Sequence, residues 1–192
     1  MGRHRQFDEA VVLDRAMETF WTHGYAGTTP AQLAEATGVG TSSLYNAFHS
    51  KRELFSRCLD VYQAQVDAMA HALLEQPGSA VECLRATFRA VVDDDLVQTQ
   101  RRGCLIGNTI VEMAGADPDL AARLKVMQDA SIGWIADRIR RGQIEGDVGA
   151  NKDAQAIAEH LGTTLAGLRV MSVLHDRDTL YGVIDSALTV LV

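Results

Sequence analysis

Apolar residues recur at intervals of three and four positions along nearly the whole chain, and no stretch alternates between apolar and polar residues as a strand would. The pattern predicts an all-α fold of about nine helices. The expected helices span residues 8–24, 29–37, 41–47, 50–76, 79–98, 104–114, 118–142, 153–175 and 178–191.

Residues that favour helix starts stand at several of these boundaries. Asp8 is a suitable N-cap for the first helix. Thr29 and Gln32 have the spacing of a capping box, and Pro30 occupies the first helical position between them. The segment Ser50–Glu53 repeats the box at the start of the long fourth helix. Local chemistry therefore supports the periodic pattern.

The expected domains are residues 1–57 and residues 58–192. The fourth helix begins in the first and ends in the second, so we expect a continuous helix at the boundary. The chain carries a net charge of −7. Residues 1–57 hold six basic and six acidic groups, whereas the remainder holds 12 basic and 19 acidic groups. The acidic remainder should avoid phosphate, which favours nucleic-acid binding by the first domain alone.

The second and third helices are short and are joined by Gly38-Val39-Gly40, which is typical of a helix-turn-helix. Their apolar residues can form a core with the first helix: Leu33, Ala34, Val39, Leu44 and Phe48. The opposite face of the third helix is polar or small: Thr41, Ser42, Ser43, Asn46 and Ala47. Asn46 suits bidentate pairing with adenine in a major groove. On the motif alone, an ordinary αα-hairpin with polar residues facing water stays open.

The full pattern is more specific. The stretch TPAQLAEATGV, Thr29–Val39, followed by SLYNAFHSKRELF, Ser43–Phe55, resembles the DNA-binding domain of the TetR-type (TetR/AcrR) transcriptional regulators. The resemblance covers roughly residues 8–57. It implies three DNA-binding helices, a helical effector-binding domain and homodimerisation through the last two long helices. It also implies a repressor that a small-molecule effector releases from a palindromic, double-stranded operator.

The resemblance also assigns roles to individual residues. It implies base contacts from the recognition helix at Thr41, Ser42, Ser43 and Asn46. It implies phosphate contacts at Thr29, Tyr45, His49 and Lys51, with Gln32 near a groove edge. Members of the family often carry a lysine early in the recognition helix, where this chain has Thr41. Arg3 and Arg5 either compensate by reaching the DNA or belong to a tail that makes no contact.

The effector site is harder to predict, because apolar residues on helical stripes more often belong to a core than to a pocket. The candidates for effector binding are Tyr62, Val66, Phe88, Cys104, Asn108 and Trp134. The segment 154–174 is apolar on more than one face, including Leu165 and Ala166, which indicates burial on both sides. A second copy of the chain is the expected partner for one side, and a core within one chain is the alternative.

The three cysteines, Cys58, Cys83 and Cys104, are widely spaced and form no paired motif, so neither a disulfide nor a metal site is expected. Cys104 follows Arg101, Arg102 and a glycine that should break the chain. A position in the first turn of the next helix would favour its thiolate. An alternative function is therefore redox or electrophile sensing through Cys104. The competing interpretation is a small, buried, inert side chain.

Other classes of protein are less consistent with the sequence. It contains no nucleophile elbow, glycine-rich phosphate loop or metal-spaced histidine pair, so neither an enzyme nor a cofactor is expected. The run Asp93–Asp95 is interpreted as a solvated helix end rather than a cation site. A protein-interaction module without DNA binding is a third possibility. No apolar run reaches membrane-spanning length and no signal peptide is evident, so we expect a cytoplasmic protein.

Overall fold

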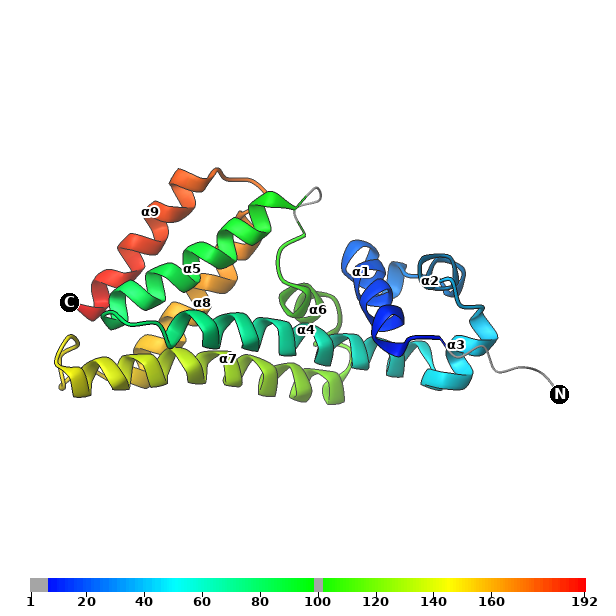
Figure 1. The fold of residues 1–192 in the computed structure, drawn as a ribbon, viewed down its shortest axis with the longest axis horizontal. Helices are drawn as coiled ribbons and strands as arrows, with labels where there is room; N and C mark the ends of the chain where they lie inside the picture. The colour runs from blue at the N-terminus through cyan, green and yellow to red at the C-terminus, as the bar shows by residue number, and fades with distance from the viewer. Residues whose placement is uncertain (1–6, 99–101) are drawn as a thin grey trace. The chain divides into compact units, whose positions relative to one another are not determined.

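The computed structural model describes residues 7–98 and 102–192, and the chain is all-α over these ranges, as predicted (Figure 1). Nine α-helices and one short 3-10 helix account for the secondary structure of the described residues. The helices are α1 (Glu9–Gly27), α2 (Pro30–Thr37), α3 (Thr41–Phe48), α4 (Lys51–Leu74), α5 (Ala80–Val97), α6 (Leu105–Met113), α7 (Pro118–Glu145), α8 (Ala154–Met171) and α9 (Arg177–Ala187), followed by η1 (Leu188–Leu191).

The first helix begins where its N-cap predicts but extends past its expected end. The Asp8 side chain accepts a hydrogen bond from the Ala10 N–H at 3.0 Å. At Gly24 the backbone leaves the helical region, with φ 72° and ψ 170°, and a further helical turn then runs to Gly27. The expected end at residue 24 was therefore a break within the helical run.

The chain forms two compact units, one ending at Gln65 and the other spanning Val66–Val192. We call them the N-terminal and the C-terminal unit. The expected domain boundary after residue 57 stays a prediction. In the N-terminal unit, Phe20 lies at the centre, where its ring meets the Phe55 ring edge-on with centroids 4.8 Å apart. Leu33 of α2 and Leu44 of α3 are also fully buried, so the apolar faces predicted for the two short helices are confirmed.

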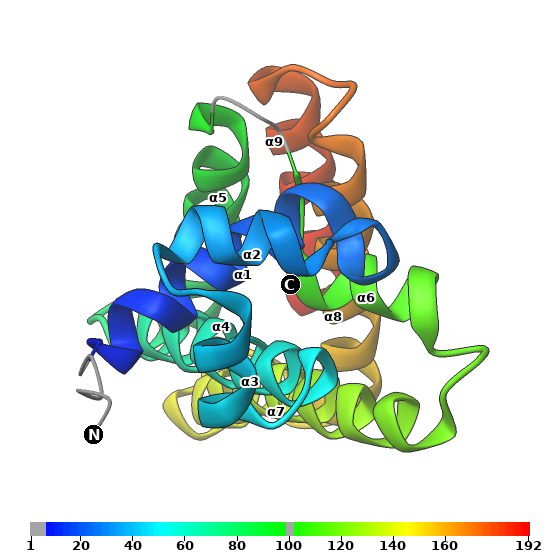
Figure 2. The same cartoon turned by 90° about the vertical axis from the view of Figure 1, so that its right-hand side faces the viewer.

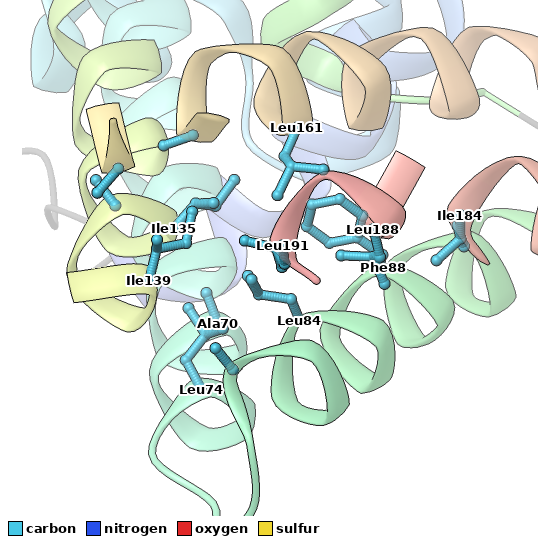
Figure 3. Packing of buried hydrophobic residues seen from close by; sticks show 14 of the residues in the cluster. Ala70, Leu74, Leu84, Phe88, Ile135, Ile139, Leu161, Ile184, Leu188 and Leu191 are labelled. Carbon is cyan, nitrogen blue, oxygen red and sulfur yellow. The ribbon is translucent and has the colours of Figure 1, made fainter. Parts of the chain in front are cut away.

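The C-terminal unit is built around one apolar cluster, to which α5, α7, α8 and α9 contribute together with the end of α4 (Figure 3). Phe88 and Leu84 of α5 face Leu161 of α8 and the C-terminal residues Leu188 and Leu191 in this cluster. In Figure 1, α9 lies along α5, which agrees with the extensive contacts between these two helices. None of the described helices is long and apolar enough to cross a lipid bilayer.

The run Asp93–Asp95 is not the solvated helix end that the sequence suggested. Asp95 is completely buried, and Arg169 of α8 donates to both of its carboxylate oxygens, from Nε at 2.9 Å and from Nη2 at 2.7 Å. Asp93 accepts hydrogen bonds from Arg177 Nε and from the Tyr181 hydroxyl, both at 2.7 Å. The prediction was wrong because helical periodicity identifies a face of a helix but not the charged residue that packs against it.

Candidate nucleic-acid interface

The capping box at the start of α2 is formed as predicted. The Thr29 hydroxyl accepts from the Gln32 N–H at 3.3 Å, and Gln32 Oε1 accepts from the Thr29 N–H at 2.7 Å. The box fixes the first turn of α2 and brings both side chains together on the exposed surface. It also occupies the Thr29 N–H and the proton of the Thr29 hydroxyl, which donates to Gln32 Oε1 at 2.8 Å. A phosphate contact from Thr29 would therefore have to displace Gln32.

The turn between α2 and α3 depends on Gly38. Its φ of 71° and ψ of 13° are left-handed, and its N–H donates to the Ala34 carbonyl at 3.0 Å, which closes the end of α2. A side chain at Gly38 would meet no atom within 4 Å, so the requirement for glycine comes from the backbone conformation alone. Figure 2 shows the short connection that results between α2 and α3.

The surface of α3 divides as the sequence predicts. Leu44 and Phe48 are buried, whereas Ser42, Ser43 and Asn46 are exposed and Thr41 is half-buried. The helix starts at Gly40 without a hydrogen bond from a capping side chain. An uncapped helix start with short polar side chains suits an anionic backbone and the edges of bases.

Lys51 and Tyr45 both lie near Tyr25, a residue that the sequence analysis did not single out. The Lys51 ammonium is 4.5 Å from the centroid of the Tyr25 ring, a cation–π contact that restrains the lysine. Partial burial raises the pKa of Tyr45, and the neighbouring Tyr25 adds to the effect. The Tyr45 hydroxyl therefore keeps its proton at neutral pH and can donate to a phosphate oxygen.

His49 is held in an unusual backbone conformation between α3 and α4. Its φ is 62° and its ψ is −41°, the only positive φ at a non-glycine position in the described residues. The Ser50 N–H donates to the Phe48 carbonyl at 2.6 Å, which makes His49 the centre of a γ-turn of the strained, positive-φ type. The imidazole is exposed. Arg3 and Arg5, the other candidate contacts, lie outside the described residues.

Both parts of the chain match a known family of regulators. Residues 12–58 match the sequence family described as bacterial regulatory proteins, tetR family, and residues 80–188 match the tetracyclin repressor-like C-terminal domain. The chain belongs to the TetR family. It is therefore a DNA-binding transcriptional regulator, as the resemblance of residues 8–57 indicated.

Relatives and solved structures agree with membership of the TetR family. The chain is 32% identical over 196 residues to an uncharacterized HTH-type transcriptional regulator of Bacillus subtilis, YezE, and the match covers 100% of both proteins. It is 29% identical to the HTH-type transcriptional repressor ComR of Escherichia coli, over 88% of this chain and 81% of that protein. A cysteine variant of the TetR family regulator CifR, complexed with 26-bp double-strand operator DNA, superposes with a TM-score of 0.90 at 32% identity, covering 100% of both chains.

The residues predicted to bind an effector in this TetR-family chain are scattered. Tyr62 is buried in the N-terminal unit, where its ring packs edge-on against Trp21 with centroids 5.1 Å apart. Val66 is half-buried at the start of the C-terminal unit, and Phe88 is fully buried in its core. Asn108 is exposed, and its side-chain amide donates to the Arg102 carbonyl at 2.8 Å. Trp134 lines a cavity between α4 and α7.

Cys104 caps α6 instead of lying within its first turn. Its Sγ accepts a hydrogen bond from the Gly107 N–H at 3.3 Å, and the side chain is half-buried. The chain does break at Gly103, which has a φ of 64°. Arg101 lies outside the described residues, and the Arg102 guanidinium donates to Gln98 Oε1 at 3.3 Å.

The other two cysteines are less accessible. Cys58 and Cys83 are buried, and burial raises the pKa of the Cys58 thiol to about 12. None of these three cysteines, all of which lie in the described ranges, forms a disulfide bond. In the ranges 7–98 and 102–192, no group of three or more histidine, cysteine, aspartate or glutamate side chains is arranged to hold a metal ion.

Proposed function

We propose that this chain is a homodimeric repressor that binds a palindromic operator through α3 and is released from it by a small-molecule effector. The observation that carries the proposal is the uncapped start of α3 with its exposed Ser42, Ser43 and Asn46, presented by a closed α2–turn–α3 unit. The relative ComR is a transcriptional repressor, which supports repression as the sign of regulation. In this proposal the protein acts by binding and has no catalytic activity.

In the proposed complex, bases and phosphates are contacted by different residues. Asn46 is the base reader, because its amide can pair with the N6 and N7 edge of adenine, and Thr41, Ser42 and Ser43 contact neighbouring bases. Lys51 and Tyr45, which both lie near Tyr25, would contact phosphates. Thr29 and His49 would do so near the helix ends, and Gln32 would lie near a groove edge. Phosphate contacts fix the register of the protein, and base contacts supply specificity.

The proposed subunit interface is formed by α8 and α9. Val170 near the end of α8, and Val173 and Leu174 just after it, expose large apolar side chains, of which Leu174 is 77% exposed. An open groove of about 460 Å³ between α8 and α9 is lined by His160, Thr164, Thr179, Gly182, Val183, Ser186 and Ala187. Ala166 and Gly167 are small and exposed, which permits another helix to approach closely.

A mobility-shift titration on the DNA upstream of the protein's own gene tests the DNA contacts. Asn46→Ala should relax sequence preference, with a loss of about 1–3 kcal/mol for the cognate site only. Lys51→Ala should weaken binding to all sequences alike and reduce the salt slope of log K by about one. Unchanged operator binding by both variants would refute the assignment of α3 and Lys51.

Sedimentation of a charge variant tests the interface. Ala166→Glu places an uncompensated charge on the exposed face of α8, so a dimer formed there should dissociate. Operator affinity should fall with it, because a two-fold operator requires both recognition helices. Ala130→Glu, at an exposed alanine of α7, is the matched control and should stay dimeric. If the Ala166→Glu protein folded and remained dimeric, the subunit interface would have to lie elsewhere.

A second candidate is the same regulator with Cys104 as its sensor. It rests on the position of the Cys104 sulfur, which is half-buried at the start of α6 and accepts a hydrogen bond from the Gly107 N–H. Such a regulator would leave its operator after oxidation or alkylation rather than after non-covalent binding of an effector.

A further inference from the structure

A cavity of about 260 Å³ lies within the C-terminal unit between α4 and α7. It is lined by His71 and Leu74 of α4, by Glu75 just after that helix, and by Trp134, Asp137, Arg138 and Arg141 of α7. The Asp137 carboxylate is paired with Arg140 at 2.7 Å. Of the six residues that the sequence suggested for effector binding, only Trp134 belongs to this lining. The cavity is slightly smaller than the roughly 300–1,000 Å³ typical of sites for drug-sized ligands, so its occupant should have only one or two rings.

One side of the cavity is apolar and partly aromatic. The rings of His71 and Trp134 lie with their centroids 5.5 Å apart and their planes inclined at 52°. Leu74 beside them is buried and belongs to the core cluster of the unit. A flat apolar group can pack against these two rings and the leucine side chain without disturbing the core.

Arg138 contributes a buried and incompletely hydrogen-bonded cation to the lining of the cavity. The Arg138 side chain is only 2% exposed; its Nη2 donates to the Gly78 carbonyl, and its Nη1 lies 3.4 Å from Glu145 Oε2. Its Nε–H is buried and has no acceptor among the described residues. A buried donor without an acceptor is unfavourable, so the site favours a ligand that supplies one.

Arg141 lies one turn further along α7. It donates to Glu145 Oε1 at 2.9 Å and to Glu75 Oε2 at 3.1 Å. Glu145 is thus shared between two arginines, and the side chain of Glu75 is 72% exposed. An ion pair to such an exposed carboxylate is weak, so a bound anion can replace Glu75 at little cost.

We propose that this cavity binds a small aromatic carboxylate, with its ring against Trp134 and His71 and its carboxylate at Arg138 and Arg141. Arginine suits this role because its planar guanidinium matches the geometry of a carboxylate, and charge-assisted hydrogen bonds are stronger in a partly enclosed site. The carboxylate supplies the acceptor that the Arg138 Nε–H lacks. The site stands on the geometry of the C-terminal unit and does not depend on the proposed operator binding.

Titration calorimetry on the full chain, with naphthoate as the probe and its neutral isostere naphthamide as the comparison, tests the proposal. Naphthoate should bind at one site per chain, and naphthamide about tenfold more weakly or worse, because it lacks the charge that the arginines recognise. Arg138→Lys keeps the positive charge but removes the Nε–H and the planar fork, so it should weaken naphthoate binding about tenfold.

Two further variants keep the test decisive if Arg138→Lys unfolds, which circular dichroism would reveal. Arg141→Gln changes an exposed side chain and should also weaken naphthoate binding. Arg177→Gln is the matched control, because Arg177 pairs with Asp93 of α5 and neither residue lines the cavity, and it should bind naphthoate like the parent protein.

Absence of saturable naphthoate binding would overturn the proposal, as would equal binding of naphthamide or parent-like binding by a folded Arg138→Lys or Arg141→Gln protein. The measurement contains no DNA. A negative calorimetric result would therefore not bear on the proposed operator binding, and a negative mobility-shift result would not bear on naphthoate binding.

Discussion

The buried ion pair between Asp95 and Arg169 should make the C-terminal unit sensitive to the loss of either partner alone. The two side chains are joined by hydrogen bonds of 2.9 and 2.7 Å, and Arg169 Nη2 also approaches the Gly103 carbonyl at 3.3 Å. Asp95→Asn leaves the arginine charge buried without a counter-charge. Breaking a buried pair in this way costs about 3–5 kcal/mol, which is a large part of the roughly 5–15 kcal/mol that stabilises a typical domain.

Removing both charges should cost much less. In the double variant Asp95→Leu with Arg169→Met no uncompensated charge remains, and apolar replacements of buried ion pairs are often neutral or stabilising. The Gly103 carbonyl loses one donor, which costs about 1 kcal/mol. The double variant should therefore be more stable than Asp95→Asn, even though it changes more atoms.

Urea unfolding followed by circular dichroism measures the difference. Asp94→Asn is the control, because Asp94 is the exposed neighbour of Asp95 and its change should stay within about 0.5 kcal/mol. A cost below about 1 kcal/mol for Asp95→Asn, or a double variant less stable than the single one, would refute the reasoning that the pair is buried and coupled.

Three further predictions concern other parts of the chain. Arg85 donates to Asp185 and lowers the pKa of that carboxyl, so the stability that the pair supplies is present above about pH 4 and is lost as the pH falls. Asp185→Asn should therefore lower the urea midpoint at pH 7 and lower it progressively less in acid. A difference in urea midpoint between the variant and the parent protein that did not change with pH would contradict this. If Cys104 is the sensor, alkylation should release the native protein and Cys58→Ser from operator DNA but not Cys104→Ser, whereas equal release of Cys104→Ser would leave this cysteine structural. His49→Gly should relieve the strained γ-turn and leave the melting temperature unchanged or raised. It should also weaken operator binding in a mobility-shift assay if the imidazole contacts phosphate. A large loss of stability would show instead that the His49 side chain supports the fold.

The features that the sequence predicts best are those decided within one helical turn. The Thr29–Gln32 box, the Asp8 cap and the left-handed Gly38 each depend on atoms no more than four residues apart. Such interactions have few alternatives, so residue type and spacing identify them. The buried and exposed faces of α3 follow from periodicity for the same reason, since 3.6 residues per turn leave Leu44 and Phe48 on one side.

Contacts between distant segments could not be predicted in this way. Helical periodicity places Asp95, unlike Asp94, on the apolar face that Phe88 and Val92 form. It does not identify Arg169, which lies 74 positions away, as the residue that packs against Asp95. Tyr25 restrains Lys51 from another helix, although its place next to a helix-breaking glycine offered a weak signal. The γ-turn at His49 has no sequence signature, because positive φ is uncommon at every residue other than glycine.

The effector-binding residues could not be identified from the sequence for a physical reason. A helical stripe contains the same residue types whether it packs into a core or lines a cavity, and only the neighbouring helices decide between these outcomes. Phe88 and Trp134 both lie on such stripes. Phe88 is covered completely by the core of the C-terminal unit, whereas Trp134 is covered on one side and open to a cavity on the other. Charges on the same face do not separate them. Arg138 and Arg141 follow Trp134 at spacings of four and seven, and Asp95 follows Phe88 at a spacing of seven. Asp95 is buried against Arg169 of α8, whereas Arg138 and Arg141 line a cavity, and this difference depends on what packs against each helix face.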